Sequence, residues 1–148
     1  MFLGEFSHAI DDKGRLTIPA RFRTALIAGA VVTRGFDRHL TIYTSDSFQK
    51  LVEKARTLSA TRPENRALFR LLFSGASEVI LDKSNRINIP GFLRSYATLD
   101  GEAVVVGAGD YVEVWNPAAW QEQLDLVNDP ATNTERFAAL DLAPGNLG

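Results

Sequence analysis

An internal repeat constrains this 148-residue chain more than any other feature of its sequence. The run DDKGRLTIP at residues 11–19 returns 71 positions later as DKSNRINIP at residues 82–90. After one inserted residue the match resumes at an offset of 72, where Tyr43 falls on Trp115 and Phe48 on Trp120. Two copies of one unit therefore fill most of the chain. We expect the two copies to share one fold, and the chain is long enough for one sizeable core or two small, interdependent ones.

Each copy is predicted to consist of short strands and one small helix. Alternating apolar residues at 6–10 and 79–81 predict a strand that leads into a polar turn. Gly14 tolerates positive φ in that turn, and its counterpart Asn85 is the next most tolerant residue type. Pro19 and Pro90 can each open a helix, which would end near residues 28 and 97. Strands at 16–18, 30–33 and 39–43, repeated at 87–89, 103–106 and 111–115, complete an α+β fold with a mainly β core.

Helical segments are expected to follow each copy. Ser45 is a candidate N-cap, Pro63 and Pro117 are candidate first residues of helices, and Thr132 with Glu135 fits a capping box. We expect a first unit with its trailing helix over residues 1–58 and a linker helix over 59–75. A second unit over 76–128 would precede a C-terminal helix and a frayed tail over 129–148.

The composition excludes several classes of protein. Without cysteine the chain has no disulfide, zinc–thiolate site or iron–sulfur cluster. Its apolar runs stay well short of the ~20 residues needed to cross a bilayer. The start of the sequence lacks the pattern of a secretory signal peptide. We therefore expect a cytoplasmic protein without a membrane partner.

Enzyme motifs are also missing from the sequence. His8 and His39 have no His or Cys at metal-ligand spacing, so structural roles are favoured for both. A nucleophile elbow, a P-loop and a zinc-protease motif are all absent. The stretch 107–109 (GAG) is more simply a hairpin turn than a dinucleotide site. We expect no catalytic residue, no metal and no cofactor.

Charge is unevenly distributed along the chain, although the net charge is only −2. Residues 1–99 carry 15 basic and 9 acidic side chains, whereas residues 100–148 carry one basic and 9 acidic side chains. One interpretation is an acidic end segregated from a basic working surface. The other is an acidic, solvated C-terminal face that keeps the protein soluble.

With catalytic and metal sites excluded, the repeated turn is the remaining candidate for a functional site. Lys13 and Arg15 flank Gly14 in the first copy, and Lys83 and Arg86 are the cations of the second. Such side chains can contact phosphates, and arginine can bind guanine through two hydrogen bonds. Alternatively, each Asp–Arg pair only braces a tight turn, contributing about 0–1 kcal/mol if exposed. Spacing alone leaves both interpretations open.

Further cations follow each turn. Arg21 and Arg23, and Arg94 in the second copy, stand on the helix after the turn. They can extend a basic face or cover strand edges with their aliphatic stems.

The two Asp-x-x-x-Arg turns, each followed by an apolar-x-Ile-Pro stretch, resemble those of the MraZ family, bacterial transcriptional regulators of the division and cell-wall gene cluster. The likeness covers essentially the whole chain, including the start MFLG and the run DKGRL at 12–16. It implies tandem SpoVT/AbrB-like units that form a pseudo-two-fold swapped-hairpin barrel with flanking helices. It also implies a nucleoid-associated, ring-like homo-oligomer that binds short direct repeats in double-stranded promoter DNA.

The resemblance assigns the DNA-binding positions. These are Lys13, Gly14, Arg15, Lys83 and Arg86, with Asp11, Asp82 and Asn85 in support. Asn85 replaces glycine in the second copy, so its contacts are expected to differ in geometry. A ring presenting several modest sites would gain avidity without a strongly basic subunit.

We therefore expect a sequence-specific DNA-binding repressor. Two other functions remain open. One is an antitoxin-like autoregulator of the same barrel class, which would need a disordered, partner-binding tail. The other is a structural interaction protein whose acidic C-terminal region binds a partner and whose turns are only braces.

Overall fold

The structure is a computed structural model that describes residues 1–140 and residue 142. The chain divides into two units, residues 1–116 and residues 117–148. The first unit contains all eight described strands and helices α1 to α4, and the second contains α5, α6 and a 3-10 turn. Within the described residues, no helix is both long and apolar enough to cross a membrane.

The elements of the first unit follow the repeat. The first copy forms β1 (Glu5–Ala9), β2 (Arg15–Thr17), α1 (Ala20–Leu26), β3 (Ala30–Arg34) and β4 (Leu40–Thr44). Next come α2 (Ser45–Ala55) and α3 (Pro63–Ser74). The second copy forms β5 (Ser77–Val79), β6 (Arg86–Asn88), α4 (Gly91–Ala97), β7 (Glu102–Gly107) and β8 (Val112–Trp115). Every strand and the small helix of one copy thus has its counterpart in the other.

The second unit is helical. It contains α5 (Pro117–Val127), α6 (Pro130–Phe137) and the 3-10 turn η1 (Ala138–Leu140). The frayed tail predicted from the sequence at residues 143–146 lies outside the described residues.

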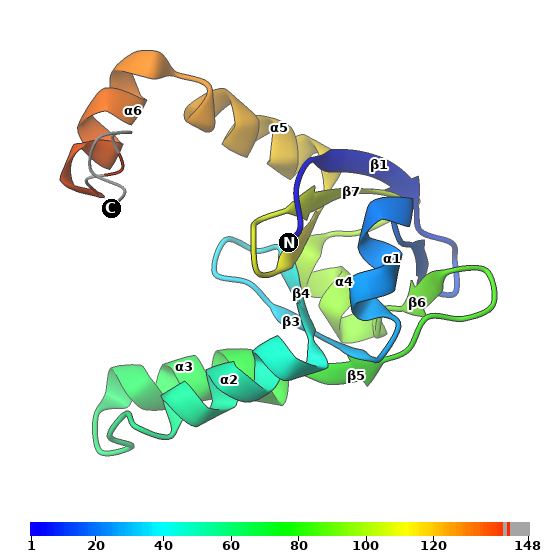
Figure 1. Cartoon of the computed structure of the whole chain (residues 1–148), viewed down its shortest axis with the longest axis horizontal. Helices are drawn as coiled ribbons and strands as arrows, with labels where there is room; N and C mark the ends of the chain where they lie inside the picture. Colours follow the sequence, from blue (N-terminus) through cyan, green and yellow to red (C-terminus); the bar gives the residue numbers. More distant parts are fainter. Residues whose placement is uncertain (141, 143–148) are drawn as a thin grey trace. The chain divides into compact units, whose positions relative to one another are not determined.

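The two copies exchange strands. The main sheet has the order β1-β7-β8-β4-β3-β5, so β1 of the first copy pairs with β7 of the second. In return β5, the counterpart of β1, pairs with β3 of the first copy. Figure 1 shows β1 beside β7. Strands β4 and β8 meet at the centre of the sheet, and β2 and β6 form a separate two-stranded ladder. Neither copy therefore completes its sheet alone.

The predicted fold class is confirmed at the level of a mixed α/β fold with a mostly antiparallel sheet. The swapped-hairpin barrel is not confirmed. Strands are exchanged, but among the described residues no ladder joins the edge strands β1 and β5, so the sheet does not close. The β2–β6 ladder lies beside the sheet as a separate pair instead of completing it.

The core lies where the copies meet. Leu16 and Ile87 face each other in the β2–β6 ladder and are almost fully buried, as are Ile18 and Ile89 just beyond it. Side chains alternate across a strand, so the burial of Leu16 leaves Arg15 and Thr17 on the opposite, partly exposed face. The same apolar residues that form the core thus set the direction in which the arginine points.

Two of the predicted N-caps, those of α2 and α6, differ from the structure. Thr44, and not Ser45, caps α2, because its hydroxyl oxygen accepts a hydrogen bond from the backbone N–H of Ser47 at 3.0 Å. Asp129, and not Thr132, caps α6 and accepts a hydrogen bond from the hydroxyl of Thr132 at 2.5 Å. In both cases a residue upstream of the predicted cap satisfies the first free N–H groups of the helix.

Replacing Leu16 with alanine is expected to lower the free energy of unfolding by about 2–5 kcal/mol, since it leaves a cavity in the ladder that joins the copies. Ile80→Ala is the matched control, because that side chain is 76% exposed and should change stability by less than about 0.5 kcal/mol. Denaturant unfolding followed by circular dichroism measures both. Equal losses for the two variants would contradict the assigned core.

Candidate nucleic-acid interface

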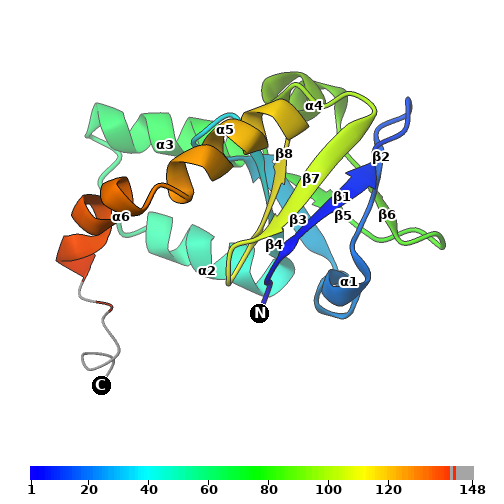
Figure 2. The same cartoon turned by 90° about the horizontal axis from the view of Figure 1, so that it is seen from above.

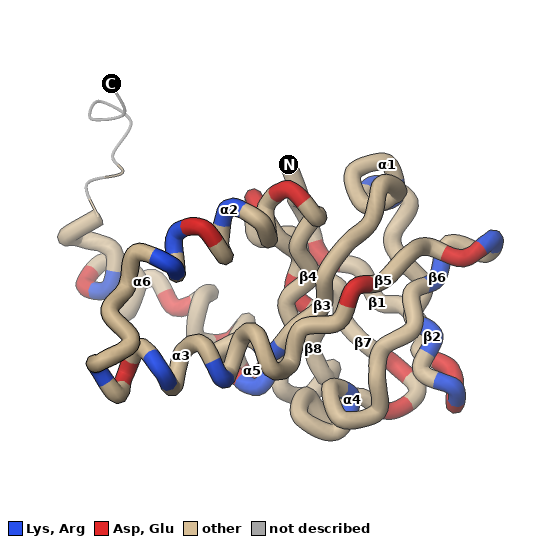
Figure 3. The backbone as a smooth tube through the Cα atoms, turned by 90° about the horizontal axis from the view of Figure 1, so that it is seen from below, with Lys and Arg blue, Asp and Glu red and all other residues tan. Residues whose placement is uncertain are grey.

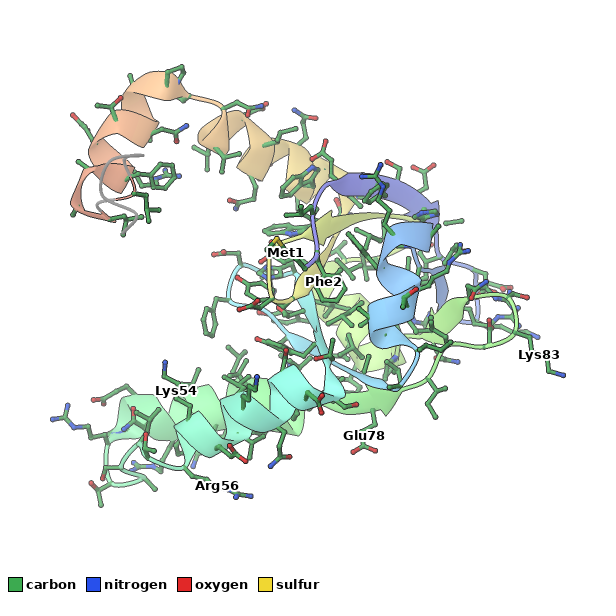
Figure 4. All side chains as sticks on the ribbon, viewed as in Figure 1. Met1, Phe2, Lys54, Arg56, Glu78 and Lys83 are labelled. Carbon is green, nitrogen blue, oxygen red and sulfur yellow. The ribbon has the colours of Figure 1, made fainter. Side chains whose placement is uncertain are left out.

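The repeated turns lie at the same end of the first unit. We call residues 11–15 the first turn and residues 82–86 the second turn. Figure 2 shows both loops at the side where β2 and β6 pair, and Figure 3 shows that each loop carries both acidic and basic residues. Lys13 and Lys83 are exposed, and Lys83 points outward from its loop in Figure 4. The paired turns therefore present cations from one surface.

The first turn is organised around one carboxylate. Asp11 Oδ1 accepts hydrogen bonds from the backbone N–H groups of Lys13 at 3.0 Å and Arg15 at 2.8 Å. Asp11 Oδ2 accepts a third hydrogen bond from Nε of Arg15 at 2.6 Å. The backbone N–H of Arg15 is the largest cause that lowers the pKa of Asp11, and its guanidinium adds to the effect. Asp11 is thus an ionised brace that shapes the backbone and orients the arginine.

The second turn repeats this arrangement atom for atom. Asp82 Oδ1 accepts from the N–H groups of Ser84 at 2.8 Å and Arg86 at 2.9 Å, and Oδ2 accepts from Nε of Arg86 at 3.0 Å. The backbone N–H of Arg86 is again the largest cause that lowers the pKa of the aspartate. Each Asp–Arg pair therefore braces its turn, as one of the two interpretations of the sequence expects.

The brace leaves part of each arginine available. Within the described residues, Arg15 is hydrogen-bonded through Nε and its backbone N–H, and its terminal nitrogens have no hydrogen-bond partner in the protein. The side chains of Arg15 and Arg86 are 36% and 29% exposed. A guanidinium held through Nε can still donate from its terminal nitrogens to an oxygen or nitrogen acceptor. Bracing and ligand binding are therefore compatible.

Positive φ is required at the same position in both turns. Gly14 has φ of +85° and Asn85 has φ of +59°, which confirms the matched backbone expected from these residue types. Gly14 is also tightly enclosed, since a Cβ there would lie 2.7 Å from the carbonyl oxygen of Ile89 and 2.8 Å from Nε of Arg94. Glycine is thus needed in the first turn for space as well as for conformation.

Backbone hydrogen bonds tie each turn to the opposite copy. The carbonyl of Gly14 accepts from the N–H of Ile89 at 2.7 Å, and the carbonyl of Asn85 accepts from the N–H of Ile18 at 3.0 Å. In addition, Nη1 of Arg86 lies 3.8 Å from Oδ2 of Asp11. The spacing of the two turns is therefore set by the β2–β6 ladder and not by flexible segments.

The three further cations lie in different places. Nε of Arg23 donates to the carbonyl of Ile18 at 2.9 Å, and Nε of Arg94 donates to the carbonyl of Ile89 at 3.1 Å. These equivalent arginines hold the chain between the second strand and the helix of each copy. Arg21, by contrast, is exposed on α1. This bracing role was not predicted from the sequence, although Arg23 and Arg94 match at the repeat offset.

Neither histidine lies in the first or the second turn. Burial, followed by the charge of Arg23, lowers the pKa of His8 on β1. His39 is buried and stacks on the ring of Trp115 with centroids 4.5 Å apart. In the described part of the chain, no group of three or more His, Asp or Glu side chains could hold a metal ion.

Fold and site together define a class: a tandem-repeat protein whose copies exchange strands and display a matched pair of Asp–Arg turns. A family model described as "MraZ protein, putative antitoxin-like" matches the chain twice, over residues 1–71 and 72–141. The two matches correspond to the two copies of the repeat. The chain belongs to the MraZ family.

Similar proteins extend over most of the chain. A protein from Thermomicrobium roseum is 53% identical over 127 residues, which cover 86% of this chain and 89% of the relative. Relatives from Herpetosiphon aurantiacus and Moorella thermoacetica are 47% and 49% identical and cover 88% and 87% of this chain, and 92% and 90% of their own lengths. All three are named "Transcriptional regulator MraZ".

Replacing Gly14 with alanine is expected to destabilise the protein by more than about 1 kcal/mol, because the side chain would meet both a left-handed backbone and the carbonyl of Ile89. Asn85→Gly, which relieves positive φ at the equivalent position, should leave stability unchanged or slightly raised. Thermal unfolding of the two variants measures the difference. A stable Gly14→Ala protein would show that the first turn is not held as described.

The aspartates are expected to titrate below the ordinary value of about 3.9 for an aspartate side chain. Because the folded-state pKa is depressed, their stabilising effect is complete above the unfolded pKa and is lost as pH falls through the folded pKa. NMR titration of the carboxyl carbons measures this, with Asp11→Asn and Asp82→Asn identifying the two signals. Midpoints at or above the ordinary value would rule out the hydrogen bonding in the turns.

Proposed function

We propose that this protein is a sequence-specific DNA-binding transcriptional regulator that contacts DNA through its paired turns. One observation carries the proposal: two equivalent turns, each with an exposed lysine and a partly exposed arginine, are fixed side by side by the β2–β6 ladder. The names of the relatives support a regulatory role, and that role is not enzymatic.

The arginines and lysines of the paired turns have different roles in DNA binding. Arg15 and Arg86 read base edges with their terminal nitrogens, because each is oriented by an aspartate and can donate two parallel hydrogen bonds. Lys13 and Lys83 contact phosphates, which position the protein without specifying sequence. Gly14 and Asn85 allow the backbone to make the turn.

The remaining positions act around the paired turns. Asp11 and Asp82 set the geometry of the arginines and stay ionised. Arg21 is exposed, whereas Arg23 and Arg94 are partly buried, and it extends the contact surface. Arg23 and Arg94 stabilise the backbone between the second strand and the helix of each copy.

The finer identity follows from the family. We propose a repressor that binds short direct repeats in the promoter of the division and cell-wall gene cluster, as a cytoplasmic, nucleoid-associated, ring-like homo-oligomer. Its units, with the boundaries expected from the sequence, belong to the SpoVT/AbrB-like swapped-hairpin type. Multivalent binding explains how a chain of net charge −2 binds a polyanion, since several modest sites on one ring engage spaced boxes together.

The antitoxin-like function is the second candidate, because the family description contains that term. It shares DNA binding with the first and differs in requiring a toxin partner. A purely structural interaction protein is less well supported, since the Asp–Arg brace leaves terminal nitrogens of Arg15 available.

Arg15→Ala and Arg86→Ala are each expected to weaken binding to the upstream region by about 5- to 150-fold, since one bidentate base contact contributes about 1–3 kcal/mol. Arg56→Ala is the matched control, because Figure 4 places Arg56 beside α2 and α3, away from Lys83. If about four phosphates are neutralised per chain, the logarithm of affinity should fall with that of salt at a slope of roughly −3 to −4 per engaged chain.

Electrophoretic mobility shift at several salt concentrations provides these values, and light scattering checks that oligomer mass is unchanged. Unaltered affinity of both turn variants would refute the assignment. Loss of binding with Arg56→Ala alone would indicate that the DNA interface lies on α2 and α3 and not on the paired turns.

A further inference from the structure

A cavity of about 300 Å³ lies in the first unit and takes no part in the proposed function. The β3–β4 turn, residues 35–39, forms one wall, while β4 and β8 form another. Leu51 of α2 and Leu72 of α3 line the apolar side. Its volume is at the lower end of the range for small-molecule sites, which are typically concave and mostly apolar with a few polar groups.

A carboxylate is held at the polar wall of this cavity. Glu113 of β8 accepts hydrogen bonds from the indole N–H of Trp115 at 3.1 Å and from Nε2 of His39 at 2.9 Å. Burial acts to raise the pKa of Glu113, but the hydrogen bond and charge of His39, together with the hydrogen bond from Trp115, outweigh it, and the pKa lies below its ordinary value. The side chain is 19% exposed, so the negative charge faces the cavity in a mostly desolvated setting.

Two aromatic rings lie beside that carboxylate. Tyr43 of β4 and Tyr111 both line the cavity, with ring centroids 5.8 Å apart and planes tilted by 45°. Burial is the largest cause that raises the pKa of both tyrosines; Tyr111 and then Glu113 add to it for Tyr43, and Glu113 adds to it for Tyr111, so both remain neutral phenols near the carboxylate. The negative faces of aromatic rings attract cations, most strongly where water is excluded.

The nearby arginine does not neutralise this wall. Arg34 lines the cavity, but its Nη1 donates to the carbonyl of Leu71 at 3.2 Å and to the hydroxyl of Ser74 at 3.1 Å. Its guanidinium also lies over the rings of Phe92 and Tyr96. The other ionisable lining groups are His39, already bonded to Glu113, and the exposed Asp37, which adds negative charge.

The cavity is preformed. The backbone of Gly35 packs against the ring of His39 so closely that a Cβ at this position would collide with it. The backbone N–H of Gly35 donates to the carbonyl of His39 at 2.7 Å, and the hydroxyl of Tyr96 donates to the carbonyl of Gly35 at 2.6 Å. Binding therefore requires little ordering of the turn, which lowers its cost.

We propose that this cavity is a binding site for a small organic cation, a primary ammonium on a short aromatic or aliphatic body. The ammonium lies against the rings of Tyr43 and Tyr111 and next to the carboxylate of Glu113. The body occupies the apolar side formed by Leu51 and Leu72. Such a ligand makes the protein responsive to an amine metabolite independently of the paired turns.

Titration of the full-length protein with phenethylammonium, followed by isothermal calorimetry and NMR, tests the proposal. The neutral 2-phenylethanol and the anionic phenylacetate are the matched ligands of similar shape. We expect binding of the cation, with shifts at Tyr43 and Tyr111, at least about tenfold tighter than that of either control, since a mostly buried carboxylate and two aromatic faces favour a positive charge.

Tyr111→Leu should weaken phenethylammonium binding by about fivefold through loss of one aromatic face. Glu113→Gln should weaken it further, and Glu78→Gln on β5 is the control carboxylate, marked in Figure 4. Tyr111→Leu keeps the test valid if Glu113→Gln fails to fold. Equal binding of cation and alcohol, or unchanged binding in Tyr111→Leu, would overturn the proposal.

Discussion

The pairing of β2 with β6 is the constraint on which the rest of the first unit depends. The ladder brings Leu16 and Ile87 together in the core and, by strand alternation, turns Arg15 to the other face. The backbone bonds just beyond it, from Ile18 to Asn85 and from Ile89 to Gly14, fix each turn to the opposite copy. A single packing arrangement thus joins the copies and sets the distance between the two arginines.

A carboxylate then converts each turn into a defined structure. Asp11 and Asp82 each accept two backbone hydrogen bonds and one from an arginine, so one ionised group satisfies the turn backbone and orients the side chain. This explains why an acidic residue belongs in a surface proposed to bind a polyanion. The carboxylate lowers the local positive charge, but it fixes the arginine in one geometry and reduces the entropy lost on binding.

Local features were predictable from the sequence where a residue type has few conformational choices. The positive φ of Gly14 and Asn85 and the Asp–Arg spacing both follow from short-range chemistry. Strand exchange was expected only from the family resemblance, because β1 and β7 are about a hundred residues apart and their short apolar patterns fit several partners. The cap of α2 was misplaced by one residue because Thr44 and Ser45 are both good caps. Likewise, the contact of His39 with Glu113 joins residues 74 positions apart, and no local pattern indicates it.

The central claim is that both turns face the same DNA, and site-specific cross-linking tests it most directly. A photoreactive side chain is placed at position 13, at position 83 or, as a control, at position 54 on α2 (Figure 4). The protein is then irradiated on the DNA upstream of its gene. The account predicts cross-links from positions 13 and 83 within the protected DNA and none from position 54. Cross-links from position 54 without any from the two turns would contradict it.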